Sequence, residues 1–213
     1  MIREEHIGGG WEFPFVLYRP SKVTGNMPLV VHLHGAGEVG TGNEDLYKVD
    51  VHGISHIMTT TAEYPCLVLL PQCMDGSFWI AEIPNIQRFI ERAIVHFGAD
   101  RQRIYLTGLS MGGYGTWLTA ERYPQMFAAI APVCGGGMVW RSDVLDMPIW
   151  AFHGTDDTIV YPTETLNMIQ KLRTLRSNDP EIKATFLDGV GHNAWDYAYT
   201  EELLQWLLSK KRN

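Results

Sequence analysis

Residues 103–113 read RIYLTGLSMGG, and the architecture expected for the whole chain follows from this stretch. A short β-type run over 103–107 leads directly into the glycine turn 108–112, which has the pattern GxSxG around Ser110. A helical pattern over 113–123 comes next and stops before Pro124. A strand, a tight glycine turn and a helix form the context in which GxSxG lifts a serine hydroxyl above a sheet. We therefore expect Ser110 at the carboxyl end of a strand.

The rest of the chain repeats the alternation of apolar strands and amphipathic helices. Further strand-like runs rich in Val, Ile and Leu lie at 29–33, 66–70, 127–133, 149–152 and 184–187. Further helical patterns cover 84–97, 162–176 and 197–210. This order predicts the α/β class, with a mostly parallel central sheet and helices on both faces.

Two segments lie outside this alternation. Residues 11–19 are expected to form an extended strand, with an antiparallel edge as one option if Pro14 faces away from any partner. Residues 35–62 are glycine-rich and polar, which predicts a long loop followed by a short helix. Because no repeat or linker is visible, we expect one domain over 1–213 without an inserted lid domain.

Composition narrows the class of protein. The 213 residues carry a formal net charge of −7, with 46% hydrophobic and 19% charged residues, which suits one domain with a sizeable core. An acidic chain lacks the basic face of nucleic-acid-binding proteins, and no apolar run reaches the roughly 18 residues of a membrane span. Residues 1–20 lack the apolar run of a signal peptide, so we expect a cytoplasmic location. The oligomeric state stays open.

A serine nucleophile needs a base within hydrogen-bond reach, itself oriented by a carboxylate. Only His153 and His192 follow Ser110 in the chain, and His192 lies in GVGHN (189–193), just beyond the last predicted strand. We assign the base to His192 and expect His153 to be a structural residue that holds the loop of the acid in place.

The acid is then Asp156 or Asp157, which both leave the carboxyl end of the strand 149–152. Asp188 and Asp196 flank the histidine and are weaker candidates. At this point the residues themselves leave the choice between Asp156 and Asp157 open.

The segment HLHGAGE (32–38) follows the first predicted parallel strand and carries small residues that let a backbone approach a tetrahedral intermediate. We expect the N–H groups of Ala36 and Met111 to form an oxyanion hole. Glu38 either contacts substrate or binds loop backbone. No HExxH, metal-spaced carboxylate cluster, CxxC or phosphate-loop pattern occurs, so no cofactor and no metal ion is implied.

Five motifs in order resemble those of small α/β-hydrolase esterases: HLHGAGE (32–38), PQC (71–73), GLSMGGYGTW (108–117), HGTDDTIV (153–160) and GVGHNAWDYAY (189–199). The resemblance covers roughly residues 28–200. It extends to the phospholipase/carboxylesterase type, the polyhydroxybutyrate-depolymerase-like and feruloyl-esterase-like enzymes, and the "predicted peptidase" group. It implies the α/β-hydrolase fold and a triad of Ser110, Asp157 and His192, because the aspartate of HGxxDxxV falls on Asp157.

The resemblance also implies an activity, namely a serine esterase that needs no cofactor and hydrolyses small carboxylic esters through an acyl-enzyme. Short acyl chains on soluble alcohols, phenols or sugars are the expected substrates. Trp195 matches a position that is often aromatic, and we expect it to line the substrate pocket together with Glu38 and Trp79. A peptidase or acyltransferase with the same triad, or a non-catalytic binding protein of the same fold, are the alternatives.

Overall fold

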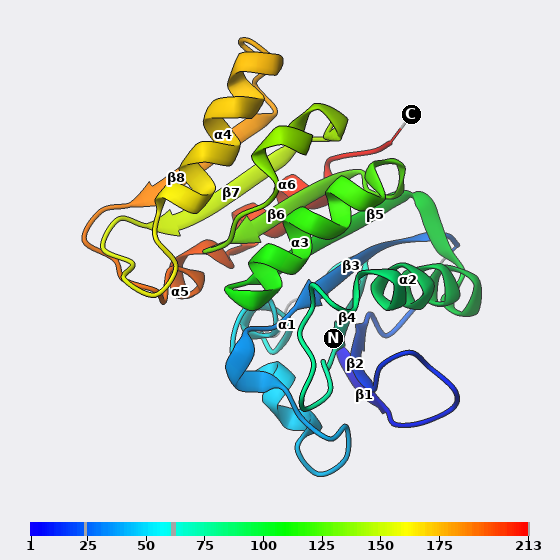
Figure 1. Cartoon of the computed structure of the whole chain (residues 1–213). Coiled ribbons are helices and arrows are strands. Elements are labelled where there is room, and N and C mark those ends of the chain that lie inside the picture. Colours follow the sequence, from blue (N-terminus) through cyan, green and yellow to red (C-terminus); the bar gives the residue numbers. More distant parts are fainter. Residues whose placement is uncertain (24, 61–62, 213) are drawn as a thin grey trace.

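Strand β5 (Ala99–Leu109) lies inside an eight-stranded sheet with the order β1-β2-β4-β3-β5-β6-β7-β8 (Figure 1). The computed structural model describes residues 1–23, 25–60 and 63–212. The remaining strands are β1 (Ile2–His6), β2 (Phe15–Arg19), β3 (Met27–Leu33), β4 (Leu67–Pro71), β6 (Ala129–Val133), β7 (Ile149–Gly154) and β8 (Ile182–Leu187). The strands from β4 to β8 run parallel, while β1 and β2 are antiparallel additions at one side. The predicted mostly parallel sheet is confirmed.

Helices cover both faces of this sheet, as Figure 1 shows for α2, α3 and α4 on the front and α6 behind. The helices are α1 (Ser55–Met58), α2 (Ile83–Phe97), α3 (Met111–Arg122), α4 (Thr163–Leu175), α5 (Trp195–Ala198) and α6 (Glu201–Leu208). Short 3-10 turns are η1 (Ala36–Glu38), η2 (Leu46–Asp50), η3 (Pro124–Met126) and η4 (Val139–Val144). No described helix is long and apolar enough to cross a membrane.

The two-sided burial of the sheet explains its continuous apolar runs. In β3, Leu29 and Val31 pack into the core beneath α2 and α3, whereas Val30 packs into the core on the opposite face. A strand buried on both faces has no polar side, so it is apolar at consecutive positions. The apolar run that predicted this strand therefore also agrees with its burial on both faces.

The N-terminal part of the sheet differs from the strand predicted over residues 11–19. Only Phe15–Arg19 of the segment 11–19 is a strand, and it pairs with β4 on one side and β1 on the other. Strand β1 was not predicted, because its residues IREEH are mostly polar and exposed or half-buried. Pro14 lies outside the strand, so its missing N–H removes no ladder bond.

The C-terminal helix is also interrupted. The predicted helix 197–210 is divided into α5 and α6, because Thr200 has an extended backbone and its hydroxyl accepts the N–H of Leu203 as a helix N-cap. The loop predicted over 35–62 contains η1, η2 and the short helix α1, and its positions 61 and 62 lie outside the described residues.

Helix α2 offers a direct test of this packing, because one of its faces is buried and the other is exposed. Ile90 is fully buried, while Val95 is 75% exposed. We expect Ile90→Ala to lower the free energy of unfolding by about 2–5 kcal/mol. Val95→Ala should change it by less than about 0.5 kcal/mol. Urea unfolding followed by circular dichroism measures both, and equal losses would contradict the packing of α2 described above.

Glu121 in α3 is a second testable feature, because it is a carboxyl buried in the fold. Its Oε2 accepts the N–H of Met138 at 3.1 Å, and Oε1 has no hydrogen-bond partner among the described residues. Burial raises the pKa of Glu121 to about 7, and the bond from Met138 and the charge of Arg141 offset this only in part.

A carboxyl whose pKa is higher in the folded than in the unfolded chain takes up a proton on folding. Its contribution to stability is therefore present below the unfolded pKa of about 4.3 and is lost as the pH rises through about 7. We expect Glu121→Gln to flatten the fall of Tm between about pH 5 and about pH 8, relative to wild type. Thermal unfolding across this range measures the effect, with the exposed Glu202→Gln as control. An unchanged slope in Glu121→Gln would refute it.

Candidate active site

Ser110 occupies the one-residue turn between β5, which ends at Leu109, and α3, which begins at Met111. Its backbone has φ 54° and ψ −116°, a conformation that a side chain disfavours and that tertiary contacts must maintain. The N–H of Ser110 donates to the Val133 carbonyl at 2.9 Å, and its own carbonyl accepts the N–H of Tyr114 at 3.1 Å. Hydrogen bonds with β6 and with α3 therefore hold the turn in place.

The glycines of GxSxG are required by the neighbouring backbone. A Cβ on Gly112 would overlap the carbonyl oxygen of Leu33 and would lie 2.7 Å from that of His34. A Cβ on Gly108 would overlap the carbonyl oxygen of Gly112. The turn therefore packs backbone against backbone beside the end of β3, which is also where the predicted oxyanion loop begins.

Ser110, His192 and Asp157 form one chain of hydrogen bonds at the carboxyl ends of β5, β7 and β8. Ser110 Oγ lies 2.8 Å from His192 Nε2, and His192 Nδ1 lies 2.7 Å from Asp157 Oδ2. Since a carboxylate only accepts, Nδ1 carries the proton and Nε2 is left to accept the serine hydroxyl proton. The structure thus brings together the three side chains selected from the sequence.

Asp157, rather than Asp156, faces the histidine. Asp157 is 2% exposed, and its Oδ1 accepts the N–H groups of Ile159 and Val160, both at 2.9 Å. Burial by itself would raise the pKa of Asp157, but the hydrogen bond from His192 and those two N–H groups outweigh it and hold the pKa below its ordinary value. Asp156 is exposed and contacts the Thr155 hydroxyl at 3.2 Å.

Asp188 and Asp196 are exposed as well. Asp196 accepts a hydrogen bond from the Asn193 side chain at 2.9 Å.

His153 lies behind the carboxylate and touches the loop of the acid. Its Nε2 is 2.9 Å from the Val160 carbonyl and 3.3 Å from Asp157 Oδ2, and its Nδ1 is 2.7 Å from Thr165 Oγ1. Both neighbours of Nε2 are acceptors, so this nitrogen carries a proton. Burial lowers the pKa of His153, although the Val160 bond and the Asp157 charge act in the opposite direction. The ring therefore ties β7 and α4 to the Asp157 loop.

The oxyanion loop is oriented by His34, whose ring is buried. The N–H of Cys73 donates to Nε2 of His34 at 2.9 Å, so Nδ1 carries the proton and donates to the Gly35 carbonyl at 2.6 Å. Burial lowers the pKa of His34 to about 4, which keeps the ring neutral as this arrangement requires. The Gly35 carbonyl and the Ala36 N–H belong to one trans peptide group and point in opposite directions. The Ala36 N–H is thereby turned away from the His34 ring.

The predicted second donor, the N–H of Met111, belongs to the first residue of α3. Such an N–H has no acceptor within its own helix. An oxyanion hole formed by the N–H groups of Ala36 and Met111 stays a prediction.

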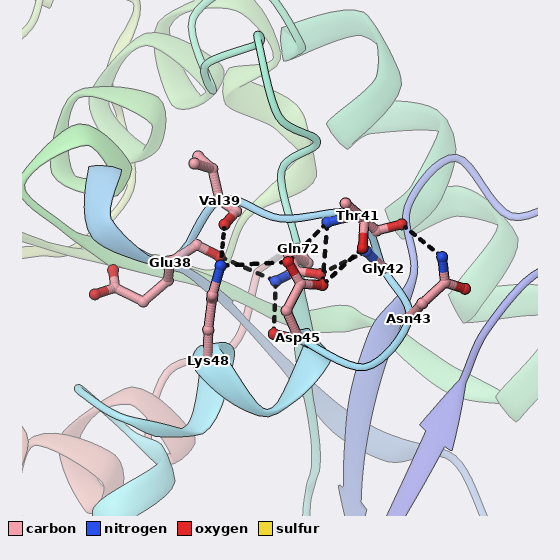
Figure 2. A network of polar contacts seen from close by, with 8 residues as sticks. All are labelled: Glu38, Val39, Thr41, Gly42, Asn43, Asp45, Lys48 and Gln72. Atoms are coloured by element: carbon pink, nitrogen blue, oxygen red, sulfur yellow. Dashed lines mark hydrogen bonds and ion pairs between the residues drawn. The ribbon is translucent and has the colours of Figure 1, made fainter.

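Beyond Ala36, the loop is held by the network of polar contacts in Figure 2. The buried Gln72 amide donates to the carbonyls of Glu38 at 3.1 Å and Asp45 at 3.0 Å, and accepts the N–H of Gly42 at 3.0 Å. Lys48 adds a bond to the Val39 carbonyl at 3.2 Å. This assigns a structural role to the PQC motif.

A cavity of about 250 Å³ opens beside Ser110 and His192. Glu38 and Trp195 line it, as expected from the sequence, and so does Ala36 of the predicted oxyanion loop. The ring of Trp195 lies 5.1 Å from that of His192, centroid to centroid. Five other lining residues were not predicted as site residues, namely Gly35, Gly37, His52, Leu109 and Ile159. For His52, the aperiodic loop 35–62 carries no signal that could have found it.

Trp79 requires a correction, because it does not line this cavity. Its side chain is fully buried, and its indole Nε1 donates to the carbonyl of His34 at 2.9 Å. Trp79 therefore supports the oxyanion loop from within the core. An aromatic residue near a loop has the same sequence signature whether it faces substrate or core.

Metal-ligating side chains gather at one place among the described residues, where ligand atoms of Cys134, Asp157 and His192 lie within 4.8 Å of one another. Asp157 and His192 already bond to each other, and burial raises the pKa of the Cys134 thiol to about 12. Since a thiol binds metal as the thiolate, this donor set fits a resident metal ion poorly.

No protein-family model matches the chain. Over 132 residues it is 30% identical to poly(3-hydroxyalkanoate) depolymerase C of Paucimonas lemoignei, covering 55% of this chain and 30% of that protein. Over 151 residues it is 27% identical to the bifunctional acetylxylan esterase/xylanase XynS20E of Neocallimastix patriciarum, covering 68% of this chain and 21% of that protein. The chain thus spans less than a third of the length of these curated relatives.

Solved structures give a fuller match. A thermostable esterase superposes with a TM-score of 0.81 at 30% identity, over 99% of this chain and 63% of that one. The acetyl xylan esterase of Aspergillus awamori superposes with a TM-score of 0.71 over 97% of this chain and 99% of that one, and its 16% identity shows a shared fold alone. The α/β-hydrolase fold and the likeness to its esterases are confirmed.

Substitution of each aspartate tests which of the two candidate acids takes part in catalysis. Asp157→Asn should lower kcat/KM for a small aryl ester by about a thousandfold or more, because the amide favours the wrong tautomer of His192. Asp156→Asn, one residue away and exposed, should change it by less than about threefold. Steady-state kinetics on folded variants measures both. A larger loss for Asp156→Asn would overturn the assignment of the acid.

Proposed function

We propose that this chain, an α/β-hydrolase with esterases among its relatives, is a serine esterase that hydrolyses carboxylic esters through an acyl-enzyme. One observation carries the proposal, namely the continuous hydrogen-bond chain from Ser110 Oγ through His192 to Asp157 at the mouth of a cavity. This is the arrangement that makes a serine hydroxyl nucleophilic at neutral pH.

The reaction follows from the geometry. Ser110 Oγ attacks the ester carbonyl carbon while its proton passes to His192 Nε2, and Asp157 stabilises the resulting imidazolium. The N–H groups of Ala36 and Met111 donate to the oxyanion. When the carbon–oxygen bond to the alcohol breaks, His192 returns the proton to the leaving oxygen. A water molecule then attacks the acyl-enzyme by the same steps and releases the acid.

The size of the cavity favours small substrates. At about 250 Å³ it falls below the range of roughly 300–1,000 Å³ that is usual for sites that hold drug-sized ligands. We therefore propose short acyl groups on soluble alcohols, phenols or sugars. Relatives named as acetylxylan and feruloyl esterases support this choice. The cytoplasmic location expected from the sequence stays a prediction.

Covalent labelling tests the nucleophile directly. A fluorophosphonate should attach to Ser110 and to no other residue, as mapped by mass spectrometry of the digested protein. Ser110→Ala should lose both the label and, by several orders of magnitude, the turnover of para-nitrophenyl acetate, because triad residues act as a unit. Ser77→Ala serves as the matched control, because Ser77 is a serine whose hydroxyl donates a hydrogen bond to Glu82.

Two outcomes would count against the proposal. One is a label on another residue, and the other is more than about a tenth of wild-type turnover in folded Ser110→Ala. Parallel assays with a matched anilide, and with an added alcohol as acyl acceptor, distinguish an esterase from a peptidase or an acyltransferase.

A further inference from the structure

Glu38 is the acidic side chain that lines the catalytic cavity together with Ser110. Its side chain is only 12% exposed, and its Oε2 atom is buried without a hydrogen-bond partner among the described residues. A buried acceptor without a donor carries a desolvation cost. Other buried polar atoms of the described residues also lack a partner, Glu121 Oε1 among them, but Glu38 Oε2 is the carboxylate oxygen of this kind that belongs to a residue lining the catalytic cavity.

The carboxyl lies close to the reacting atoms. A Cβ placed on Gly35 would be 3.0 Å from Glu38 Oε2 and 3.7 Å from the Cβ of Ser110, so both side chains converge above the same glycine. Figure 2 shows the Glu38 side chain pointing away from the polar network that binds its carbonyl oxygen. The backbone of Glu38 is therefore held while its carboxyl is directed elsewhere.

The backbone N–H groups of Gly35 and Glu38 act on the carboxyl and lower its pKa, but no described group donates to Oε2 with hydrogen-bond geometry. The nearest imidazole nitrogen, His34 Nδ1, is 3.9 Å from Glu38 Oε2 and directs its proton to the Gly35 carbonyl. Burial raises the pKa of Glu38, and His52 of the same cavity and the backbone N–H groups of Gly35 and Glu38 offset this only in part. An unpaired carboxylate here would also oppose the negative charge that forms on the oxyanion.

We propose that Glu38 is a specificity-determining residue that accepts a hydrogen bond from a hydroxyl group of the substrate, so that the preferred substrates are hydroxylated esters. These are esters with a free hydroxyl a few atoms from the ester carbonyl, as in partly acylated polyols and sugars or in esters of hydroxy acids. This inference rests on the proposed esterase function.

A hydroxyl suits this site better than an ammonium group does. It can bond to either the ionised or the protonated carboxyl, whereas an ammonium ion needs the ionised form, which burial disfavours.

Two pairs of substrates test the proposal with the intact chain. Glycerol monoacetate is compared with propyl acetate, and methyl 3-hydroxybutyrate with methyl butyrate, so that the hydroxyl lies on the alcohol side in one pair and the acyl side in the other. We expect wild type to prefer the hydroxylated member of at least one pair by about tenfold in kcat/KM, because a good buried hydrogen bond has about that effect. The pair in which this preference is seen shows whether Glu38 binds a hydroxyl on the alcohol side or on the acyl side of the ester.

Variants then assign that preference to Glu38. In Glu38→Leu the ratio of the two kcat/KM values should fall to about one, and in Glu38→Gln, which retains an acceptor oxygen, it should be intermediate. Ile159→Val alters an apolar wall of the same cavity and should keep the wild-type ratio. The ratio is independent of the amount of active enzyme, so a general loss of activity does not imitate the effect.

The inference is wrong if wild type shows no preference in either pair, or if folded Glu38→Leu and Glu38→Gln keep the wild-type ratio. Both results leave ester hydrolysis intact. Absence of hydrolysis of all four esters and of para-nitrophenyl acetate by wild type would instead refute the proposed function, and with it this inference.

Discussion

The close contact between the turn at Ser110 and the end of β3 is the constraint on which the site depends. Gly112 packs directly against the carbonyls of Leu33 and His34, where no side chain fits. Ser110, two residues before Gly112, has a positive φ, and the oxyanion loop begins at the same contact. The backbone of the nucleophile turn and the start of the predicted oxyanion loop are therefore packed against each other.

A second layer of buried polar residues fixes the groups around this contact. His34 orients the Gly35–Ala36 peptide, Gln72 holds the backbone of the loop that follows, and His153 ties down the segment of Asp157. His34 and Gln72 link segments 39 and 34 residues apart in sequence, whereas His153 links the consecutive elements β7 and α4. Such support keeps the dipoles aimed at the reacting atoms before substrate arrives, and this preorganisation is the main source of transition-state stabilisation in acyl transfer.

Glu38 differs from these supporting residues, because its Oε2 atom is buried without a hydrogen-bond partner among the residues described. Departures from complete polar satisfaction are expected where a protein meets its ligand, since the ligand then completes the hydrogen bonds. The catalytic centre and the proposed selectivity therefore have different origins. Ser110, His192 and Asp157 satisfy one another, while the carboxyl beside them is satisfied by what enters the cavity.

The sequence by itself determined the parallel sheet, α2, and the candidate residues at Ser110 and His192. These depend on local signals, namely continuous apolar runs, helical periodicity and a glycine turn between a strand and a helix. The residues alone left Asp156 and Asp157 open, and the likeness to esterase motifs favoured Asp157, which the structure places beside His192. Only the tertiary structure decided that β1 joins the sheet, that Trp79 is core and that His52 and Ile159 line the cavity. These features depend on contacts between segments far apart in the chain, and such contacts leave no periodic trace in the sequence around either partner.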